Sequence, residues 1–413
     1  MIQTFGNDAT NTARIVTISL MAHPAPAIVN DRFAPRLALV YAALFLAVGW
    51  YLPLFPVWLS AQGLDASAIG FVLAAFQFTR IVGTPAGTRL SDRYGTPKGG
   101  IVISALATVM ALVVVGCASG FPAILAAAIL YSLTTAPIMP LIDAYALKGL
   151  SQRALPYGPV RLWGSVAFIV ATLSGGVLLG FVRRTDLIWL IFVGGCLVAA
   201  ATLALVPLAR VEPVTARTGA RSHLRSPAFL AIVAAGCLIQ ASHAVYYGFS
   251  TLDWSAKGYD GVTIGILWAL GVAAEIVLFA LAPRLPASIG PVTLILIGAA
   301  GGVVRWIATA FDPPLALLAP LQMLHALSFG ATHLGTMMFL SRNAPEGGRA
   351  AAQGDVATAN GVMMAAASAL AGLLYGAGGS HAYLAMAMLA VAGGAFALLA
   401  SRLRYPQSAD VGG

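Results

Sequence analysis

Residues 51–95, YLPLFPVWLSAQGLDASAIGFVLAAFQFTRIVGTPAGTRLSDRYG, align without a gap with residues 246–290, YYGFSTLDWSAKGYDGVTIGILWALGVAAEIVLFALAPRLPASIG. Thirteen of the 45 aligned positions are identical, and they include Tyr51, Asp65 and Arg89 of the first copy. An apolar composition inflates matches between aliphatic residues, but it does not bring tyrosine, aspartate and arginine into register. The chain therefore contains an internal repeat, with its two copies offset by 195 residues.

The composition is typical of a membrane protein. Of the 413 residues, 59% are hydrophobic and 9% are charged, whereas roughly a quarter of the residues in soluble domains are charged. Apolar runs of about 18 residues or more recur along the chain, and a run of that length can cross a bilayer as a helix. The sequence therefore predicts an all-α polytopic membrane protein. Because Cys117, Cys196 and Cys237 share no metal-ligand spacing, we expect no metal site and no cofactor.

Polar, glycine and proline breaks divide the apolar runs into twelve predicted transmembrane helices. These spans cover residues 35–59, 67–90, 99–118, 121–147, 159–181, 186–208, 227–250, 262–283, 289–311, 315–341, 352–377 and 380–401. One long polar connection separates six spans from the other six. We therefore expect two pseudo-symmetric six-helix bundles, with the division 1–34 (tail), 35–208 (first bundle), 209–226 (linker), 227–402 (second bundle) and 403–413 (tail).

The basic residues predict the orientation of the chain. If both termini are cytoplasmic, 17 of the 23 lysines and arginines fall on the cytoplasmic side, in agreement with the positive-inside rule. Three fall outside (Arg183, Arg184 and Lys257) and three lie within spans (Arg80, Arg161 and Arg305). The net charge of +9 thus reports topology, and we expect the lipid bilayer, not a nucleic acid, as the partner.

Ionisable side chains inside the predicted spans are the candidate functional residues. A charge at the centre of a membrane helix costs roughly 2.5 to 3.5 kcal/mol on insertion scales, so each one needs an explanation. The candidates are Arg80, Asp143, Arg161, His243, Glu275, Arg305, His325 and His333. The repeat aligns Arg80 with Glu275, which predicts opposite charges at equivalent depths, either as a cavity-lining pair or as a structural ion pair.

The remaining expectations concern the neighbours of these groups. Arg305 has no acid in its own span, so Glu275 or a bound anion is its expected partner. Asp143 and Arg161 lie near the cytoplasmic ends of their spans, where they are either part of the site or a pair that ties spans four and five. His243, with Tyr246 and Tyr247, predicts a polar and aromatic wall in span seven.

The stretch LHALSFGATH, residues 324–333, places His325 and His333 eight residues apart. On an ideal α-helix they are offset by about 80° and roughly 12 Å. We expect His325 to face the interior, while His333 fits a site or a packing role equally well. Arg80, Glu275, Arg305 and His325 are expected to converge on one hollow between the bundles.

These groups suggest a coupling mechanism. Burial favours the protonated form of a carboxyl, and a nearby arginine favours its ionised form. An anion that competes for Arg305 or Arg80 would allow Glu275 to take up a proton, so that anion and proton uptake are linked. Three arginines in the spans, against Asp143 and Glu275, mildly favour an anionic substrate.

The segment after span two, GTRLSDRYGTPKG at 87–99, resembles the signature loop of the major facilitator superfamily. Asp92, Arg93 and Gly95 carry the match, and Gly87 is displaced by one position. In that superfamily the loop latches the two halves on the cytoplasmic side, so the resemblance implies that these four residues form a gating loop. Parallel repeats of six spans are also the internal symmetry of this superfamily.

Longer stretches resemble the phenylpropionate-permease group, which is related to nucleoside:proton symporters and to lactose permease. The stretches are LPLFPVWLSAQGL (52–64), YGPVRLWGSVAFIVA (157–171), QASHAVYYGFS (240–250), LWALGVAAEIVLF (267–279) and LHALSFGATHLGTMMFLSR (324–342). The resemblance implies a monomeric secondary transporter of the bacterial inner membrane that works by alternating access. Its implied activity is proton symport of a small organic solute, such as the aromatic carboxylate phenylpropionate.

Other functions stay open at this stage. They are an uncoupled facilitator, a proton-driven exporter, and a nucleoside or sugar symporter. A membrane enzyme would need a metal cluster, paired carboxylates or an activated nucleophile. Because the sequence has no HExxH, GxSxG or phosphate-loop motif, we expect that the protein is not an enzyme.

Overall fold

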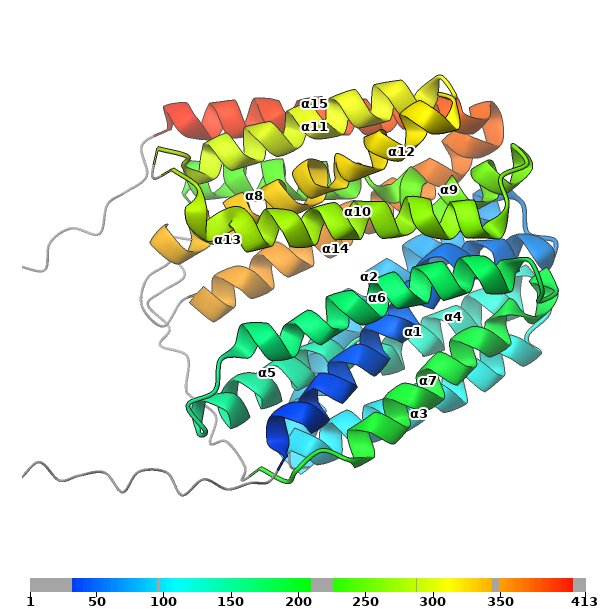
Figure 1. Cartoon of the computed structure of the whole chain (residues 1–413), viewed down its shortest axis with the longest axis vertical. Helices are drawn as coiled ribbons and strands as arrows, with labels where there is room; N and C mark the ends of the chain where they lie inside the picture. The colour runs from blue at the N-terminus through cyan, green and yellow to red at the C-terminus, as the bar shows by residue number, and fades with distance from the viewer. Residues whose placement is uncertain (1–31, 95–96, 209–225, 287, 344–348, 404–413) are drawn as a thin grey trace, which may run out of the picture. The chain divides into compact units, whose positions relative to one another are not determined.

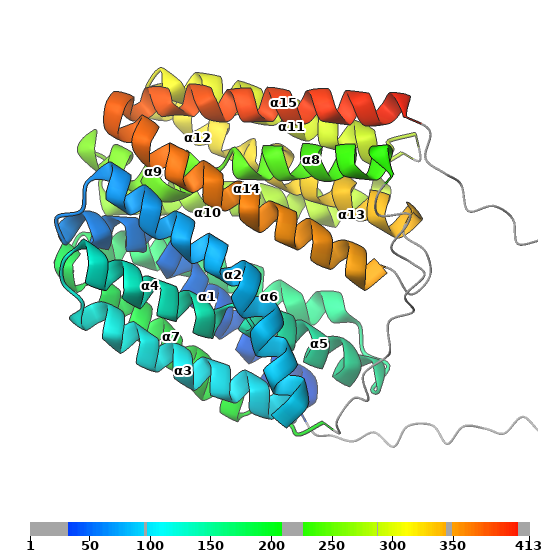
Figure 2. The same ribbon diagram turned by 180° about the vertical axis from the view of Figure 1, so that it is seen from behind.

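The computed structural model describes residues 32–94, 97–208, 226–286, 288–343 and 349–403. From Arg32 onward, the described residues belong to one compact unit. All regular secondary structure in them is helical (Figure 1). The described chain begins and ends at the same end of this unit (Figures 1 and 2), which we call the terminal end; the opposite end is the far end.

The helices of the first half of the chain correspond to six predicted spans. They are α1 (Phe33–Ala61), α2 (Ala66–Tyr94), α3 (Pro97–Cys117), α4 (Phe121–Thr135), α5 (Ile138–Ser151), α6 (Tyr157–Leu179), the short η1 (Arg184–Asp186) and α7 (Leu187–Leu203). Helix α7 ends five residues before the predicted 208, because Pro207 disfavours helical backbone in the residue before it.

The second half follows the same plan. Its elements are α8 (Pro227–Ala241), α9 (Ala244–Ala256), α10 (Gly261–Leu281), η4 (Ala282–Arg284), α11 (Pro291–Ala310), α12 (Leu315–Met323), the π-helical η5 (Ala326–Ala331), α13 (Thr332–Asn343), α14 (Arg349–Gly378), η6 (Gly379–His381) and α15 (Ala382–Arg402).

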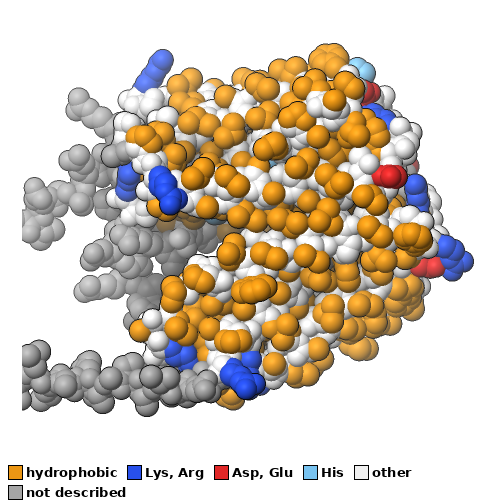
Figure 3. All heavy atoms as spheres, viewed as in Figure 1, with side chains coloured by type: hydrophobic (Ala, Val, Ile, Leu, Met, Phe, Trp, Pro, Cys, Tyr) orange, Lys and Arg blue, Asp and Glu red, His pale blue; other side chains and the backbone are white. Residues whose placement is uncertain are grey.

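Eleven helical stretches of the described chain are long and apolar enough to cross a bilayer. One of them, Ala352–Arg402, has 51 residues and contains both α14 and α15 with the turn η6 between them, so it crosses twice. The prediction of twelve transmembrane helices is therefore confirmed. Figure 3 shows apolar side chains over the middle of the visible face and charged side chains at its two ends, as a bilayer requires.

Three spans are interrupted near their middle. The fourth breaks between α4 and α5 at Pro137, because proline lacks a backbone N–H and its ring clashes with the preceding turn. The tenth contains the π-helical turn η5 between α12 and α13. Interruptions of this kind are tolerated at membrane depth only where protein or a cavity surrounds the backbone.

The seventh span breaks between α8 and α9 without a proline. Here Ser242 Oγ donates to the Ile239 carbonyl at 2.6 Å, and Nδ1 of His243 lies 3.2 Å from the Ile239 carbonyl and 3.1 Å from the Gln240 carbonyl. Polar side chains thus satisfy the Ile239 carbonyl at the break, while the Gln240 carbonyl also accepts from the backbone N–H of His243 at 3.1 Å.

Three main pairs of helices join the halves near the far end: α2 with α14, α6 with α10, and α1 with α9. A Cβ added to Gly70 would lie 2.6 Å from Cα of Gly372, and a Cβ on Gly176 would overlap the Gly261 carbonyl oxygen. Only glycine allows two helix backbones to approach this closely. The far end is therefore closed by backbone contact between the halves.

A small ion cluster fastens the far end of the second half. Lys257 Nζ lies 2.5 Å from Asp253 Oδ2 of α9 and 2.5 Å from Asp312 Oδ1 in the α11–α12 connection. Burial by itself raises the pKa of Asp312, but hydrogen bonds from Lys257 and Ser380 outweigh it, so this pKa lies below its ordinary value. Burial by itself lowers the pKa of Lys257, but the two carboxylates outweigh it and raise this pKa.

The glycine contact predicts opposite effects for two alanine substitutions in α14. Gly372→Ala places a Cβ against the backbone of Gly70 and Ala66 and should lower the free energy of unfolding by about 1–3 kcal/mol through overpacking. Gly354→Ala, with no atom within 4 Å of the new Cβ, is the matched control and should be neutral or stabilising by up to about 1 kcal/mol. Thermal unfolding in detergent measures both, and equal midpoints would contradict the contact.

The ion cluster predicts a loss of stability for Lys257→Met. The substitution leaves the buried carboxylate of Asp253 without its cation, and removing one partner of a buried pair costs about 3 kcal/mol. Adding Asp253→Asn should restore most of this loss, which a double-mutant cycle of unfolding free energies would measure. A double variant no more stable than Lys257→Met alone would show that the pair is not coupled.

The contribution of this ion cluster to the stability of the fold depends on pH. Because the pKa of Asp312 is lowered in the folded protein, its contribution to stability is present above the unfolded pKa and is lost as pH falls through the folded pKa. The difference in melting temperature between wild type and Lys257→Met should therefore shrink between about pH 5 and about pH 2. A difference that stays constant over this range would contradict the assignment.

Candidate functional site

A chain of three titratable side chains links three helices of the second half. Arg305 Nη1 of α11 lies 3.2 Å from His325 Nδ1, at the junction of α12 and η5. His325 Nε2 lies 3.4 Å from Glu275 Oε2 of α10. Arg305 is fully buried, and its Nη2 donates to Gln322 Oε1 at 2.8 Å. We call Arg305, His325 and Glu275 the Arg305 chain.

The partners of two histidines fix which ring nitrogen carries the hydrogen. A guanidinium only donates, so Nδ1 of His325 must accept from Arg305, and the hydrogen of the neutral ring lies on Nε2, toward Glu275. Carbonyl oxygens only accept, so Nδ1 of His243 donates to Ile239 or Gln240, and its Nε2 accepts from Ser328 Oγ at 3.1 Å. The two neighbouring rings therefore have opposite tautomers.

Aromatic rings enclose the guanidinium of Arg305. Its Cζ lies 4.5 Å from the ring centroid of Tyr246 and 4.5 Å from that of Trp306, which are cation–π distances. Trp306 Nε1 donates to Ser242 Oγ at 2.9 Å, and this bond ties the ring to the break in span seven. Nε of Arg305 has no hydrogen-bond partner in the described chain.

The π-helical turn changes the relation between His325 and His333. The rings of His325 and Phe329 stack with centroids 5.1 Å apart, and those of Phe329 and His333 stack at 6.2 Å. A π-helix turns less per residue than an α-helix, so it removes the offset of about 80° that an ideal α-helix predicts. His325 is buried and His333 is exposed, so the two imidazoles lie at opposite ends of one aromatic stack.

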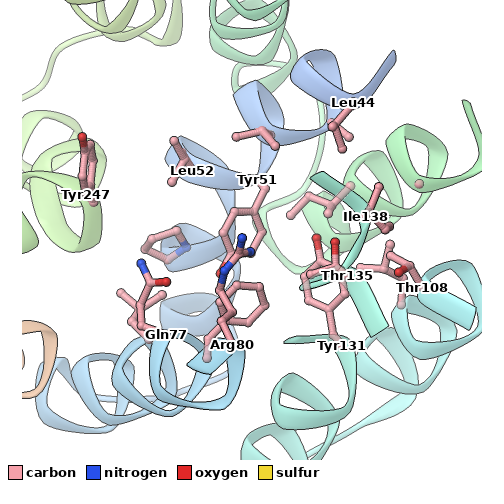
Figure 4. Close-up of a pocket in the computed structure, with 18 of the residues that line it drawn as sticks. Leu44, Tyr51, Leu52, Gln77, Arg80, Thr108, Tyr131, Thr135, Ile138 and Tyr247 are labelled. Atoms are coloured by element: carbon pink, nitrogen blue, oxygen red, sulfur yellow. The ribbon is translucent and has the colours of Figure 1, made fainter. Parts of the chain in front are cut away.

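A cavity of about 400 Å³ lies between the two halves. The first half lines it with Tyr51 of α1, Gln77 and Arg80 of α2 and Tyr131 of α4, and the second half contributes Tyr247 of α9 and Asn360 of α14. Figure 4 shows the Arg80 side chain beside Tyr51, with Tyr247 on the opposite wall. Arg80 is the one charged residue in the described lining.

The structure separates groups that the sequence analysis expected to meet. Arg80 lines the cavity, whereas Glu275, Arg305 and His325 are not part of its described lining. Within the described residues, Glu275 forms no ion pair with either arginine. Its ion-pair partner there is His325, which stands between it and Arg305 because α10 and α11 are separated by the tenth span. The expected direct pairs, Arg80–Glu275 and Arg305–Glu275, are therefore replaced by two separate sites.

Tyr247 connects these two sites. It lines the cavity, and its ring stacks on His243 with centroids 5.6 Å apart. The His243 ring in turn meets His325 edge-on at 5.3 Å. A continuous set of rings thus leads from the cavity wall to the Arg305 chain, and the predicted polar and aromatic wall of span seven forms its middle.

Asp143 and Arg161 lie in the same region but do not form the expected direct pair. Asp143 Oδ1 accepts hydrogen bonds from Tyr41 at 2.6 Å and from Tyr157 at 3.1 Å. The Arg161 guanidinium packs instead over Phe45, 4.0 Å from the ring centroid. The two tyrosine hydroxyls occupy the carboxylate that the arginine was expected to bind, so this group joins α1, α5 and α6.

The predicted gating loop is only partly described. Helix α2 continues to Tyr94, so Gly87, Asp92 and Arg93 belong to its last turns and not to a loop. A Cβ on Gly87 would lie 2.6 Å from the ring of Pro137, which explains a glycine at this crossing. The Asp92 side chain and Gly95 lie outside the described residues.

Sequence reasoning did not single out the polar groups around Arg80. Gln77 lies one turn before Arg80 on α2, a spacing that could have been noticed. The repeat also offered a signal, since it aligns Tyr51 with Tyr246: Tyr51 lies beside Arg80 (Figure 4), and Tyr246 lies against Arg305. Asn360 and Tyr131 come from other helices, and no local pattern points to them.

The titratable side chains of the described residues are not arranged as a metal centre. No three His, Cys, Asp or Glu side chains there are grouped as a metal ion would require. What the arrangement provides is two joined halves with a cavity between them and titratable groups beside it, which defines the class of membrane transporters.

Comparisons with known proteins place the chain in a family. Residues 35–385 match the model of the MFS_1 like family, so the protein belongs to this family of major facilitator transporters and is not an enzyme. It is 33% identical over 366 residues to the "Probable 3-phenylpropionic acid transporter" of Escherichia coli K12, covering 86% of this chain and 94% of that one. It is 26% identical over 312 residues to the maltose permease of Geobacillus stearothermophilus, covering 75% and 79%.

The fold is also found among solved structures. The nucleoside transporter NupG superposes with a TM-score of 0.78 and 15% identity, over 90% of this chain and 100% of that one. This likeness confirms the predicted fold of two six-helix bundles. Together with the family match, this fold makes the protein a multi-pass membrane protein and a secondary transporter of a small molecule.

The hydrogen-bond partners predict the ¹⁵N spectrum of labelled histidine. At neutral pH, His325 should carry its hydrogen on Nε2 and His243 on Nδ1, with the resonances assigned from His325→Gln and His243→Gln. Ser328→Ala should shift only the Nε2 resonance of His243, because it removes that partner alone. A His325 ring protonated at Nδ1 would contradict the bond from Arg305.

Proposed function

We propose that the protein is a proton-coupled symporter that carries a small aromatic carboxylate across the bacterial inner membrane by alternating access. The observation that carries this proposal is the Arg305 chain: Glu275, which has 19% of its side chain exposed, is joined through His325 to a fully buried arginine. A carboxyl at this depth is costly as an ion, so it is suited to taking up and releasing a proton.

Protonation of Glu275 would change the contact between α10 and the tenth span. His325 Nε2 lies 3.4 Å from Glu275 Oε2, so an ionised Glu275 attracts the positive end of the Nε2–H dipole. A proton on Glu275 removes that charge and weakens the attachment of α10 to η5. Because α10 also packs against α6 of the first half, the proton would alter one of the helix pairs that join the halves.

The terminal end is proposed to face the cytoplasm, because most lysines and arginines outside the spans belong to that side. The glycine contacts close the far end, which corresponds to a carrier whose outer end is shut. Alternating access then consists of opening the α2–α14 and α6–α10 contacts at the far end while the halves meet at the terminal end. A proton gradient supplies the energy, and a monomer is sufficient.

An aromatic carboxylate fits both the relative and the cavity. The E. coli relative is named as a probable transporter of 3-phenylpropionic acid. The lining of the cavity consists of one arginine together with tyrosine and aliphatic side chains. Such a lining can bind a solute that carries an anionic group on an apolar ring. An uncoupled facilitator, a proton-driven exporter and a nucleoside or sugar symporter are the alternatives that the following experiment separates.

Uptake into proteoliposomes tests the proposal. With an imposed inward proton gradient, the wild type should concentrate 3-phenylpropionate, and a protonophore should abolish accumulation. Glu275→Gln should lose at least about 90% of this accumulation yet still exchange labelled for unlabelled substrate, because exchange needs no net proton movement. Asp186→Asn, which neutralises a partly exposed carboxylate at the far end, is the matched control and should accumulate normally.

Each alternative gives a different result. Equilibration unaffected by the protonophore would identify a facilitator, and expulsion of substrate against its gradient would identify an exporter. Uptake of uridine or maltose in place of 3-phenylpropionate would identify a nucleoside or sugar symporter. Normal accumulation by Glu275→Gln would overturn the proton site.

A further inference from the structure

Arg80 is a charged side chain without a partner. Within the described residues its guanidinium has no hydrogen bond and no ion pair, although it lies within a membrane span and is largely removed from the surface. Arg305, in a span of the other half, has Gln322 and His325 as partners. A buried charge left unpaired costs several kcal/mol, and such a group in a cavity is typical of a binding site for the opposite charge.

The groups around Arg80 share this lack of partners. The hydroxyls of Tyr51 and Tyr131 and the amide of Gln77 form no hydrogen bond with other described residues, and all three line the same cavity. Oδ1 of Asn360, on the opposite wall, is buried without a partner. The hydroxyls and the Gln77 amide face the open cavity, and a few convergent polar groups in an otherwise apolar cavity are typical of a ligand site.

The charge of the cavity sets the charge of that ligand. Its described lining contains Arg80 and no aspartate or glutamate. A polyhydroxylated solute such as a sugar donates many hydrogen bonds and is best held by carboxylates, which are absent from this lining. A guanidinium presents two parallel N–H groups that match the two oxygens of a carboxylate.

The shape of the cavity beside Arg80 favours an aromatic body. The rings of Tyr51, Phe76 and Tyr131 pack against one another, with centroids 5.2 Å apart for Tyr51 and Phe76 and 5.3 Å apart for Phe76 and Tyr131. Phe76 lies one turn before Arg80 on α2. Offset and edge-to-face contacts with a further ring add roughly 0.5–1.5 kcal/mol each.

We infer that Arg80 binds the carboxylate of a monocarboxylic substrate, and that Tyr51, Phe76 and Tyr131 hold its apolar ring. This inference rests on the proposed symport of an aromatic acid and names its anchor. The proton site and the substrate site are then different: the Arg305 chain belongs to the second half, and the Arg80 site belongs to the first half and is completed by Asn360 and Tyr247 across the cavity.

Equilibrium binding to the purified protein tests the anchor. The probes are 3-phenylpropionate and its neutral amide, 3-phenylpropionamide, which share one skeleton and differ in charge. The wild type should bind the acid at least tenfold more tightly than the amide. Arg80→Gln should weaken acid binding by about 10- to 100-fold, the range for losing a hydrogen bond to a charged group, and should leave amide binding unchanged.

Two further variants bracket this result. Arg80→Lys keeps the charge but loses the two-pronged geometry, so it should bind the acid with an intermediate affinity. Arg183→Gln removes an exposed arginine at the far end and should bind both probes as the wild type does. Unchanged acid affinity in Arg80→Gln, equal wild-type affinity for acid and amide, or wild-type binding of neither probe would each overturn the inference.

A stability measurement guards against misfolding. Without ligand, Arg80→Gln should melt at or above the wild-type temperature, because the substitution removes an unpaired charge from the cavity. Arg305→Gln should melt below it, because its partners His325 and Gln322 lose their donor. A lower melting temperature for Arg80→Gln would mean that Arg80 has a structural partner, which contradicts the binding role.

The proton and anchor proposals can fail independently. Glu275→Gln should bind the acid with wild-type affinity while it fails to accumulate it. If Glu275→Gln accumulates normally but Arg80→Gln loses its preference for the acid, the proton site is wrong and the anchor stands. If Arg80→Gln binds the acid normally while Glu275→Gln loses accumulation, the anchor is wrong and proton coupling stands.

Discussion

The guanidinium of Arg305, in the ninth span, has no exposed surface, and side chains of the second half enclose it. Arg305 cannot lose its proton, so its charge must be balanced by what surrounds it: an amide, an imidazole and two aromatic faces. His325 links Arg305 to the carboxylate of Glu275. The neutral His325 ring directs its Nε2 hydrogen toward Glu275 only when Nδ1 accepts from Arg305. A change in the protonation of Glu275 therefore affects the contact between His325 and Arg305.

The two halves use a common plan for different purposes. In each, a tyrosine at the same repeat position lies against an arginine: Tyr51 beside Arg80 and Tyr246 beside Arg305. At the position equivalent to Arg80 the second half has Glu275, so it provides both charges of its own and is balanced internally. The first half leaves its arginine unbalanced beside the cavity. In this account the carboxylate of the solute balances the charge of Arg80, and the proton binds at Glu275 in the second half.

Sequence reasoning recovered the parts that depend on local pattern. Apolar runs predict the twelve spans, and the cost of burying charge selects Arg80, Glu275, Arg305 and His325, of which the structure brings the last three together. It could not give their order, because contact between helices depends on packing that no single span encodes. The π-helical turn also escaped prediction, since LHALSFGATH has neither proline nor a glycine pair to mark it. For the same reason Arg80 was assigned to Glu275 by symmetry, although the cavity separates them.

The most direct test of the central claim is an infrared difference spectrum of the purified protein during acidification. A carboxyl that takes up a proton gains a C=O stretching band, and a carboxylate loses its own. The account predicts that one such band comes from Glu275, is absent in Glu275→Gln, and shifts in position in His325→Gln because the hydrogen-bond partner of the carboxyl has changed. A spectrum of Glu275→Gln identical to that of the wild type would show that Glu275 does not exchange a proton, and the coupling mechanism would be wrong.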